Sequence, residues 1–303
     1  MIDHGKRYPS DFEAKKMIIE IGKRMYQKGF VAANDGNITC KVGPNTIWTT
    51  PTGVSKGFMT QDMLIKVDLK GKVIIGRHKP SSELKMHLRV YEENPEVRAV
   101  THAHPPVATA FAIAGISLDA AILPEAVVQL GTVPIAKYAT PGTQEVPDSI
   151  APFVNTHNGV LLANHGALTW GKDLLESYYR LESMEYYANI IMVTGNIIGK
   201  QNELSCGQVN ELINIRTKMG VTTGGTPTCK VIEPAKSQNT PKQSLQGITP
   251  IVRPNTESER IVNKENKEPA NLHELSLGKI SKEDIIQEVV RRVTRQIQNE
   301  EGI

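Results

Sequence analysis

Apolar residues recur at helical or strand-like spacing as far as Gly220, and beyond it this regular spacing stops. Residues 221–271 are rich in Thr, Pro, Lys and Ser and contain scarcely any aromatic side chain. A segment of this composition cannot bury enough apolar surface to offset the entropy lost on ordering. We therefore predict three parts: a folded domain over residues 1–220, a flexible linker over 221–279 and an amphipathic helix over 280–303.

The predicted C-terminal helix carries one narrow apolar stripe. Its members recur at helical spacing: Ile285, Ile286, Val289, Val290, Val293 and Ile297. Arg291, Arg292 and Arg295 fall elsewhere on the helix. A single helix of this length is marginal in water, so we expect the stripe to pack against a partner.

Within residues 1–220, segments of helical and strand-like spacing alternate. Strands are expected at 38–41, 46–49, 64–67, 73–75, 97–101, 133–136 and 160–163. Helices are expected in an opening segment that stops near Gly29, at 82–92, at 107–114, and along apolar stripes from Leu174 to Ile191 and from Val209 to Met219. This interleaving predicts an α/β fold, and the early hairpin-like strands favour a mixed sheet over a purely parallel one.

Charge and composition exclude several classes of protein. The chain carries 35 Lys and Arg against 32 Asp and Glu, whereas nucleic-acid binding needs a concentrated basic face. The first residues lack the apolar core of a secretory signal, and no stretch approaches the roughly 20 apolar residues of a membrane span. Cys40, Cys206 and Cys229 are too few and too scattered for a disulfide framework or a paired-cysteine metal site, so we expect buried, inert thiols. A cytosolic enzyme fits these constraints.

Three histidines follow two predicted strands. His102 and His104 close the strand at 97–101, and residues two apart on an extended chain point to the same side. His165 comes directly after the strand at 160–163. Either motif alone would more often hold an ordinary core or surface histidine. Together they predict the ligand set of an open zinc site, with positions left for substrate or water.

Polar turns supply a second candidate site. Pro-Ser-Ser-Glu at 80–83 opens the helix that precedes the histidine strand. Serine hydroxyls and free amides at a helix start suit phosphate binding, although a capping serine with a first-turn Glu would be purely structural. Two Gly-containing turns, at 34–37 and 50–53, let the backbone approach an anion closely. We expect these three segments to contribute to one phosphate cradle.

Six motifs occur in a fixed order along the chain: NDGNIT (34–39), TPTGV (50–54), PSSELKMH (80–87), VTHAHP (100–105), YATPGT (138–143) and LLANHGAL (161–168). Together they resemble the class II aldolase/adducin family over residues 10–220. The resemblance implies a catalytic domain with a three-layer α/β/α fold around a mixed sheet. It also implies a homotetramer with active sites at subunit interfaces.

Carried onto this sequence, the resemblance implies one catalytic Zn²⁺ per subunit, held by His102, His104 and His165. Glu83 becomes the acid/base. The implied phosphate-binding residues come from the three polar segments: Gly36, Asn37, Thr52, Gly53, Ser81 and Ser82. The implied reaction is cleavage of a 6-deoxyketose 1-phosphate, first of all L-fuculose 1-phosphate. Its products are dihydroxyacetone phosphate and L-lactaldehyde, with zinc as the electron sink.

One position departs from the family pattern. Fuculose-phosphate aldolases place a tyrosine in the segment leading to YATPGT, and counting back assigns that slot to Leu123. The nearest ionisable residue is Glu125, a second catalytic candidate that an ordinary helix-start role would also explain. Glu125 resembles the methylthioribulose-1-phosphate dehydratase branch as well, so that reaction and a pentulose-5-phosphate 4-epimerase reaction stay open. A metal-free binding module, like the adducin head domain, is the rival outside enzymes.

The linker and the helix at 280–303 resemble the encapsulation peptides of bacterial microcompartment cargo enzymes. This resemblance implies shell or other cargo proteins as partners and a location in the microcompartment lumen, where the shell would contain reactive lactaldehyde. An ordinary oligomerisation or docking helix is the alternative.

Overall fold

The computed structural model describes residues 8–229. The predicted linker beyond residue 229 and the predicted helix at 280–303 lie outside the described residues. Within the described range, no helix is long and apolar enough to cross a membrane.

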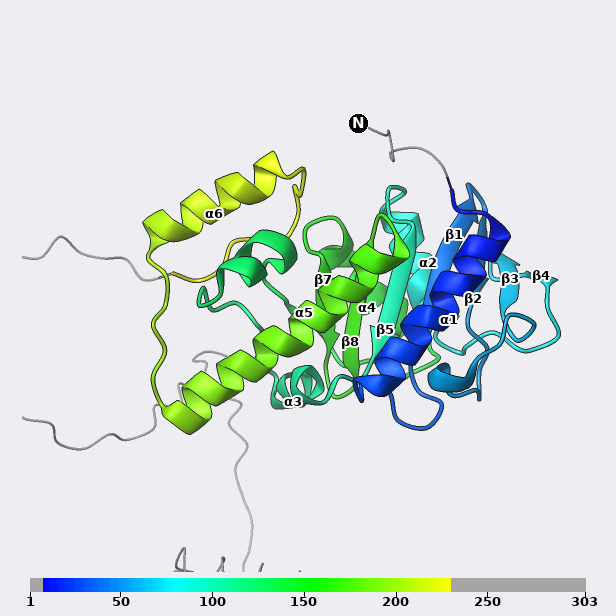
Figure 1. Ribbon diagram of the computed structural model, residues 1–303, viewed down its shortest axis with the longest axis horizontal. Helices are drawn as coiled ribbons and strands as arrows, with labels where there is room; N and C mark the ends of the chain where they lie inside the picture. The colour runs from blue at the N-terminus through cyan, green and yellow to red at the C-terminus, as the bar shows by residue number, and fades with distance from the viewer. Residues whose placement is uncertain (1–7, 230–303) are drawn as a thin grey trace, which may run out of the picture. The chain divides into compact units, whose positions relative to one another are not determined.

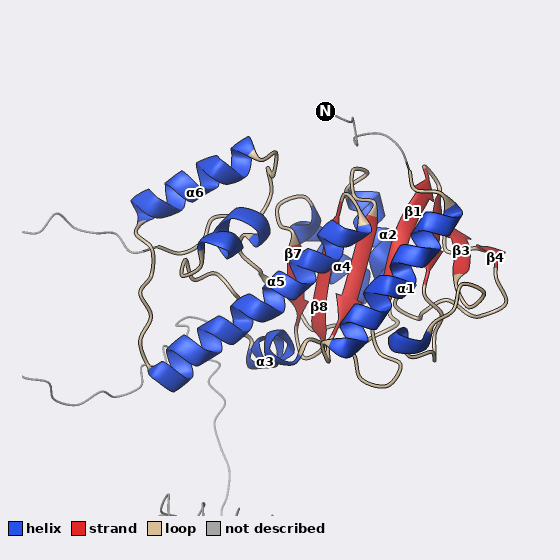
Figure 2. Cartoon of the chain, in the orientation of Figure 1, coloured by secondary structure: helices blue, strands red, loops and turns tan. Residues whose placement is uncertain are grey.

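An eight-stranded sheet forms the centre of this part of the chain (Figures 1 and 2). Across the sheet the strands are β4 (Val73–Ile75), β3 (Ile65–Asp68), β2 (Thr46–Thr49), β1 (Asn37–Gly43), β5 (Ala99–Ala103), β8 (Gly166–Gly171), β7 (Gly159–Leu162) and β6 (Ile135–Ala136). Neighbouring strands pair antiparallel, apart from the parallel pair β6 and β7. The predicted mixed sheet is confirmed.

Helices cover both faces of the sheet. One face carries α1 (Asp11–Gln27), α3 (Pro106–Ala114) and α5 (Leu174–Met192), and the other carries α2 (Leu84–Glu93) and α4 (Glu145–Val154). Figure 1 shows α1 and α5 crossing the near face of the strands. Strand β5 supplies Ala99 and Ala103 to the first core and Val100 to the second, as alternation along a strand requires. The expected α/β/α layering is therefore confirmed.

Helix α1 shows how local sequence sets these elements. Ser10 Oγ accepts from the N–H of Glu13 (3.2 Å), and the Glu13 carboxylate accepts from the Ser10 N–H (2.8 Å). This capping box satisfies two of the backbone donors that a helix start leaves free. The predicted stripe of Ile18, Ile21 and Met25 is buried against the sheet.

Within residues 8–229, one α-helix and one strand were not predicted from the sequence, nor were the three short helical turns. Helix α4 contains Pro147 and Pro152, which disfavour a helical interpretation, but Pro147 lies in the first turn and Pro152 near the end. Strand β8 follows β7 after a tight turn in which Asn164 takes a positive φ of 56°. The helix expected at 82–92 begins at Leu84, two residues late.

A smaller group of elements packs beside the end of α5. It comprises the short helical turns η2 (Ala126–Leu130) and η3 (Val193–Ile198) and the helix α6 (Cys206–Lys218). Buried Val127 of η2 and Val209 of α6 share a small apolar cluster with Ala121. The predicted helical stripe at 209–219 thus packs on η2 rather than on the sheet.

The expectation that all three cysteines are free thiols is wrong. Cys206 and Cys229 form a disulfide, whereas Cys40 is free and buried as expected. The segment around Ala121 brings the pair together, since its carbonyl accepts from the N–H of Leu204 (2.7 Å) and its N–H donates to the carbonyl of Thr228 (3.3 Å). The start of the predicted linker therefore packs on the domain, past the expected boundary at Gly220.

Candidate metal centre and anion-binding loops

The three predicted histidines meet at one end of the interior strands β5, β7 and β8. His102 lies in β5, His104 follows it, and His165 lies in the turn between β7 and β8. Because Ala103 of β5 pairs with Ala167 of β8, the end of one strand lies beside the start of the next. One nitrogen from each imidazole can be chosen so that all three lie within 4.8 Å of one another.

The first two imidazoles are oriented by contacts that their Nδ1 atoms make with oxygen acceptors. His102 Nδ1 lies 2.9 Å from the carbonyl oxygen of Ala167, so this nitrogen carries the proton. His104 Nδ1 lies 3.4 Å from the Asp35 carboxylate. The Nε2 atoms of both histidines are buried and have no hydrogen-bond partner among the described residues. Such second contacts to Nδ1 are typical of histidines that bind a metal through Nε2.

The protonation state of the site also suits a metal ion. Burial lowers the pKa of His102 to about 3, although the charge of Glu83 raises it in part. Burial also lowers the pKa of His104. Neutral imidazole is the form that coordinates a metal. Two buried Nε2 atoms without a hydrogen bond, on neutral rings and beside a third imidazole, fit a divalent metal ion.

Glycine is required where the backbone passes these rings. A Cβ on Gly166 would lie 2.5 Å from His104 Cδ2 and 2.6 Å from the carbonyl oxygen of Ala103. Gly36 has a φ of +74°, and a Cβ there would lie 2.9 Å from the carbonyl oxygen of His102. Gly36 was predicted as a phosphate contact, which stays a prediction, and the structure shows that it packs against the backbone of His102.

Glu83 is the residue immediately before α2, and its side chain faces the histidines. Its Oε1 lies 3.1 Å from His165 Nε2, and its Oε2 lies 3.4 Å from His102 Nε2. Asn37 Nδ2 donates a hydrogen bond to the same Oε2 (2.8 Å). Burial raises the pKa of the Glu83 carboxyl, but His102, His165 and the Asn37 bond together hold it well below its ordinary value. Glu83 is therefore an ionised carboxylate placed against the histidines.

The three polar loops lie together, next to Glu83. Asn37 Nδ2 donates to Ser81 Oγ (3.2 Å), which joins the first loop to the third. The N–H of Thr52 donates to the carbonyl of Lys79 (3.0 Å), which joins the second loop to the third. Two further predicted contacts, Gly53 and Ser82, are exposed, as is Thr52. The expected phosphate residues thus lie side by side, with several groups free to meet a ligand.

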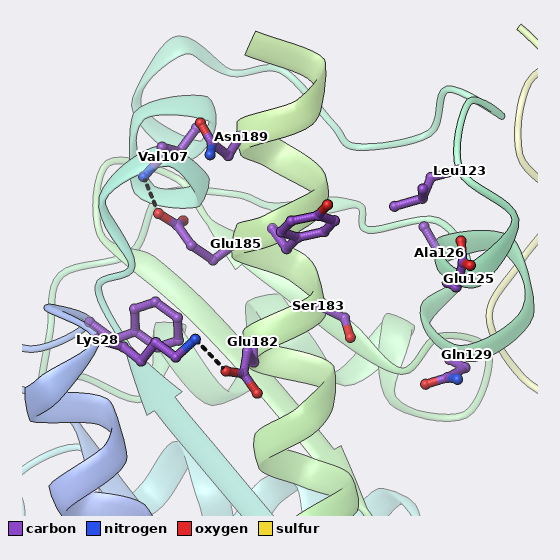
Figure 3. A pocket seen from close by; sticks show the side chains of 12 residues that line it. Lys28, Val107, Leu123, Glu125, Ala126, Gln129, Glu182, Ser183, Glu185 and Asn189 are labelled. Atoms are coloured by element: carbon purple, nitrogen blue, oxygen red, sulfur yellow. Dashed lines mark hydrogen bonds and ion pairs between the residues drawn. The ribbon is translucent and has the colours of Figure 1, made fainter. Parts of the chain in front are cut away.

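Glu125 lies in a different environment. It lines an open pocket of about 780 Å³ between α5 and η2 (Figure 3). Leu123 of the same segment, Lys28 at the end of α1 and Glu182 of α5 also line this pocket. In the described part of the chain, no hydrogen bond or ion pair links Glu125 to Glu83 or to the histidines. The catalytic role of Glu125 stays a prediction.

Three residues of the site were not singled out from the sequence. Asp35 orients His104 and stands inside the NDGNIT motif. His87 is fully buried one helical turn after Glu83, and its Nδ1 lies 2.9 Å from Thr39 Oγ1. Lys56 is buried between the first two loops. The motifs contain Asp35 and His87, but only the fold shows what they contact.

Comparison with known proteins supports this geometry. The sequence profile described as Class II Aldolase and Adducin N-terminal domain matches residues 16–192. Over 179 residues the chain is 33% identical to an L-fuculose phosphate aldolase of Methanococcus maripaludis, covering 59% of this chain and 96% of that protein. Over 191 residues it is 31% identical to a 3-oxo-tetronate 4-phosphate decarboxylase of Pectobacterium atrosepticum, covering 62% of this chain and 87% of that protein.

The fold comparison agrees with the sequence comparison. A solved L-fuculose 1-phosphate aldolase superposes with a TM-score of 0.63 at 29% identity, covering 70% of this chain and all of that one. The histidine group, the facing carboxylate and the layered mixed sheet thus occur in a chain whose relatives are, by name, enzymes that act on phosphorylated sugars or sugar acids. The chain belongs to the class II aldolase and adducin family, as a metal-dependent enzyme with a three-histidine site.

Proposed function

We propose that this enzyme is a zinc-dependent aldolase that cleaves L-fuculose 1-phosphate, or a similar 6-deoxyketose 1-phosphate. The products are dihydroxyacetone phosphate and L-lactaldehyde. The observation that carries the proposal is the double contact of Asn37, whose side-chain amide bonds both the Glu83 carboxylate and Ser81 of the anion loops. This double contact supports a site in which proton transfer and phosphate recognition lie side by side, as a small phosphorylated ketose requires.

His102, His104 and His165 would hold the metal ion. When bound, a divalent ion supplies Lewis-acid stabilisation of the negative charge that develops as the C3–C4 bond breaks. The electron pair of that bond stays on C3 of the triose fragment. In condensation the ionised Glu83 carboxylate removes a proton from C3 of the triose phosphate. In cleavage the same carboxylate first takes up a proton from solvent and then delivers it to C3. The hydrogen bond from Asn37 holds the carboxylate in place for this transfer.

Cleavage also requires a base for the proton of the C4 hydroxyl, which becomes the aldehyde. Glu125 is the candidate that the sequence offers, and no bond in the described chain joins it to Glu83. We therefore propose that a second copy of the chain supplies Glu125 to the site, in agreement with the interface sites that the family resemblance implies.

The decarboxylase relative favours a second candidate reaction. Loss of C1 as carbon dioxide from 3-oxo-tetronate 4-phosphate leaves an electron pair on C2, next to the C3 ketone, and the phosphate stays on C4 at the other side of that ketone. Protonation of C2 gives dihydroxyacetone phosphate, the triose that the aldol cleavage also releases. The same carboxylate, metal ligands and anion loops therefore serve both reactions. Only the second product differs.

A product assay separates the candidates. The metal-loaded protein receives L-fuculose 1-phosphate, L-rhamnulose 1-phosphate, 3-oxo-tetronate 4-phosphate and methylthioribulose 1-phosphate in parallel. We expect triose phosphate with lactaldehyde from a deoxyketose. Carbon dioxide from the tetronate alone would make the enzyme a decarboxylase, and water loss from the methylthio sugar would make it a dehydratase.

We further propose that the segment at 280–303 directs the enzyme into a bacterial microcompartment by binding shell or cargo proteins. Support comes from the sequence alone, through its Ile/Val stripe and the spacer before it. A chain that ends at residue 279 keeps the disulfide and the packed residues up to 229. It should retain activity and lose co-purification with shell proteins. Retained co-purification would refute this targeting role.

A further inference from the structure

Lys56 is a buried cation that the proposed reaction does not use. It begins the short turn η1 (Lys56–Phe58), and only 1% of its surface is exposed. In the described part of the chain, no carboxylate forms an ion pair with its ammonium group. A buried charge without such a partner is costly, so it needs compensating contacts.

Those contacts are two backbone carbonyls from different loops. Lys56 Nζ donates to the carbonyl of Asn34 (2.9 Å) in the first loop and to the carbonyl of Val54 (2.6 Å) in the second. An ammonium group has three donor hydrogens, so one remains available. Asn34 is the first residue of the NDGNIT motif, and Val54 is the last residue of the TPTGV motif.

With this contact, the three loops become tied in a closed triangle. Asn37 joins the first loop to the third, and Thr52 joins the second to the third. Lys56 supplies the remaining side, between the first and the second. Each loop is thus fixed to both of the others, although their exposed ends belong to no helix or strand.

The turn that carries Lys56 has little room to move. A Cβ on Gly22 of α1 would lie 2.6 Å from the carbonyl oxygen of Lys56 and 2.5 Å from Met59 Cε. Helix α1 therefore packs directly against the backbone of the turn. Burial lowers the pKa of Lys56 to about 8, opposed by the charges of Asp35 and Glu83, so the side chain is mainly cationic at neutral pH.

We infer that Lys56 is a positioning residue for phosphate recognition, which fixes the loops at 34–37 and 50–54 and places a buried positive charge behind them. The enzyme thereby prefers a phosphorylated ketose to the same sugar without phosphate. This inference rests on the proposed assignment of the loops to substrate phosphate. It concerns binding rather than bond cleavage, because within residues 8–229 the hydrogen bonds of Lys56 go to loop carbonyls and to none of the histidines.

The test compares Lys56→Met with Lys41→Met. Lys41 is a matched control: it is 4% exposed, and its Nζ donates to the carbonyl of Pro95 (3.4 Å) at the far end of β1. For each metal-loaded variant, one measures the dissociation constant of inorganic phosphate and the kcat/KM for phosphorylated and unphosphorylated ketose. Metal content and urea unfolding are recorded alongside.

For Lys56→Met we expect phosphate binding and kcat/KM for the phosphorylated ketose to weaken by about tenfold, the size of one lost charge-assisted contact. The kcat/KM for the unphosphorylated ketose and the metal content should match wild type. Lys41→Met should keep the wild-type preference for phosphate. If Lys56→Met does not fold, Lys56→Gln retains an N–H donor without the charge and should show a smaller loss of the same kind.

Equal loss for both ketoses would show a merely structural role and overturn the inference, as would unchanged phosphate binding. If wild type cleaves none of the deoxyketose phosphates but Lys56→Met still weakens phosphate binding, the proposed reaction fails and the role of Lys56 stands. If wild type cleaves them and Lys56→Met has no effect on phosphate preference, the reverse holds.

Discussion

The metal centre and the anion loops lie next to each other but are built in different ways. Register within the sheet brings His102 and His165 together, and backbone packing fixes them. The loops instead depend on side-chain ties, through Asn37 and Lys56, and their ends at Thr52 and Ser82 are exposed. In the proposed function, chemistry belongs to the region fixed by strand register and backbone packing, and substrate choice belongs to the region held by side-chain hydrogen bonds.

Removal of a metal ligand should have the largest effect. His104→Ala leaves two histidines where tetrahedral metal sites use three protein ligands or more. We expect bound metal to fall below the detection limit of elemental analysis and activity to be lost with it. His157→Ala is the control, since this histidine lies away from the centre and contacts Thr156. Normal metal content in His104→Ala would remove His104 from the ligand set.

Glu83→Gln should separate chemistry from metal binding. The amide keeps the shape of the carboxylate but cannot carry the proton, so kcat should fall about 10²–10⁴-fold with metal still bound. Glu92→Gln, on the helix α2 that follows Glu83, is the exposed control. An unchanged kcat would show that another group moves the proton, and loss of metal would make Glu83 a ligand.

Ser81→Ala should produce a graded change in the loop region. The substitution removes the acceptor for Asn37 and for the N–H of Glu83, so the third loop loosens. We expect KM for the phosphorylated ketose to rise about tenfold while metal content is unchanged, as for one lost hydrogen bond to a charged group. A fall in kcat alone would place Ser81 with the metal centre and blur the distinction between the two regions.

Substitution of His87 tests how the free energy of unfolding responds to pH. Burial lowers its pKa to about 3, below the ordinary value near 6.5, so the unfolded chain binds the extra proton first. The free energy of unfolding should therefore fall as pH drops from about 6.5 towards 3, by up to about 1.4 kcal/mol per pH unit for this residue. The free energy of unfolding, measured with urea on chelator-treated protein at several pH values, should depend less steeply on pH in His87→Gln than in wild type. An equal slope in both proteins would contradict the buried, neutral state of His87.

Much of the metal centre could be predicted from the sequence because its ligands follow strands. Alternation along β5 places His102 and His104 on one side, and His165 lies in the turn just before β8, the strand that pairs with β5. The roles of Asp35 and Lys56 could not be predicted, because each acts on a residue or carbonyl that only the fold brings near.

The disulfide shows the same limit. Cys206 and Cys229 are 23 residues apart, and nothing in that spacing indicates pairing. The backbone of Ala121 forms hydrogen bonds with Leu204 and Thr228, which lie near Cys206 and Cys229, and so holds the two cysteines close together. Strand β8 and helix α4 were missed for a related reason, since a tight turn and two prolines obscured their local patterns.

A competition in one vessel tests the central claim most directly. Metal-loaded protein receives equal concentrations of L-fuculose 1-phosphate and 3-oxo-tetronate 4-phosphate, and lactaldehyde and carbon dioxide are measured against triose phosphate formed. The account predicts one lactaldehyde per triose phosphate, little carbon dioxide, and loss of both products after chelation. Carbon dioxide in step with triose phosphate, without aldehyde, would contradict it and assign the site to decarboxylation.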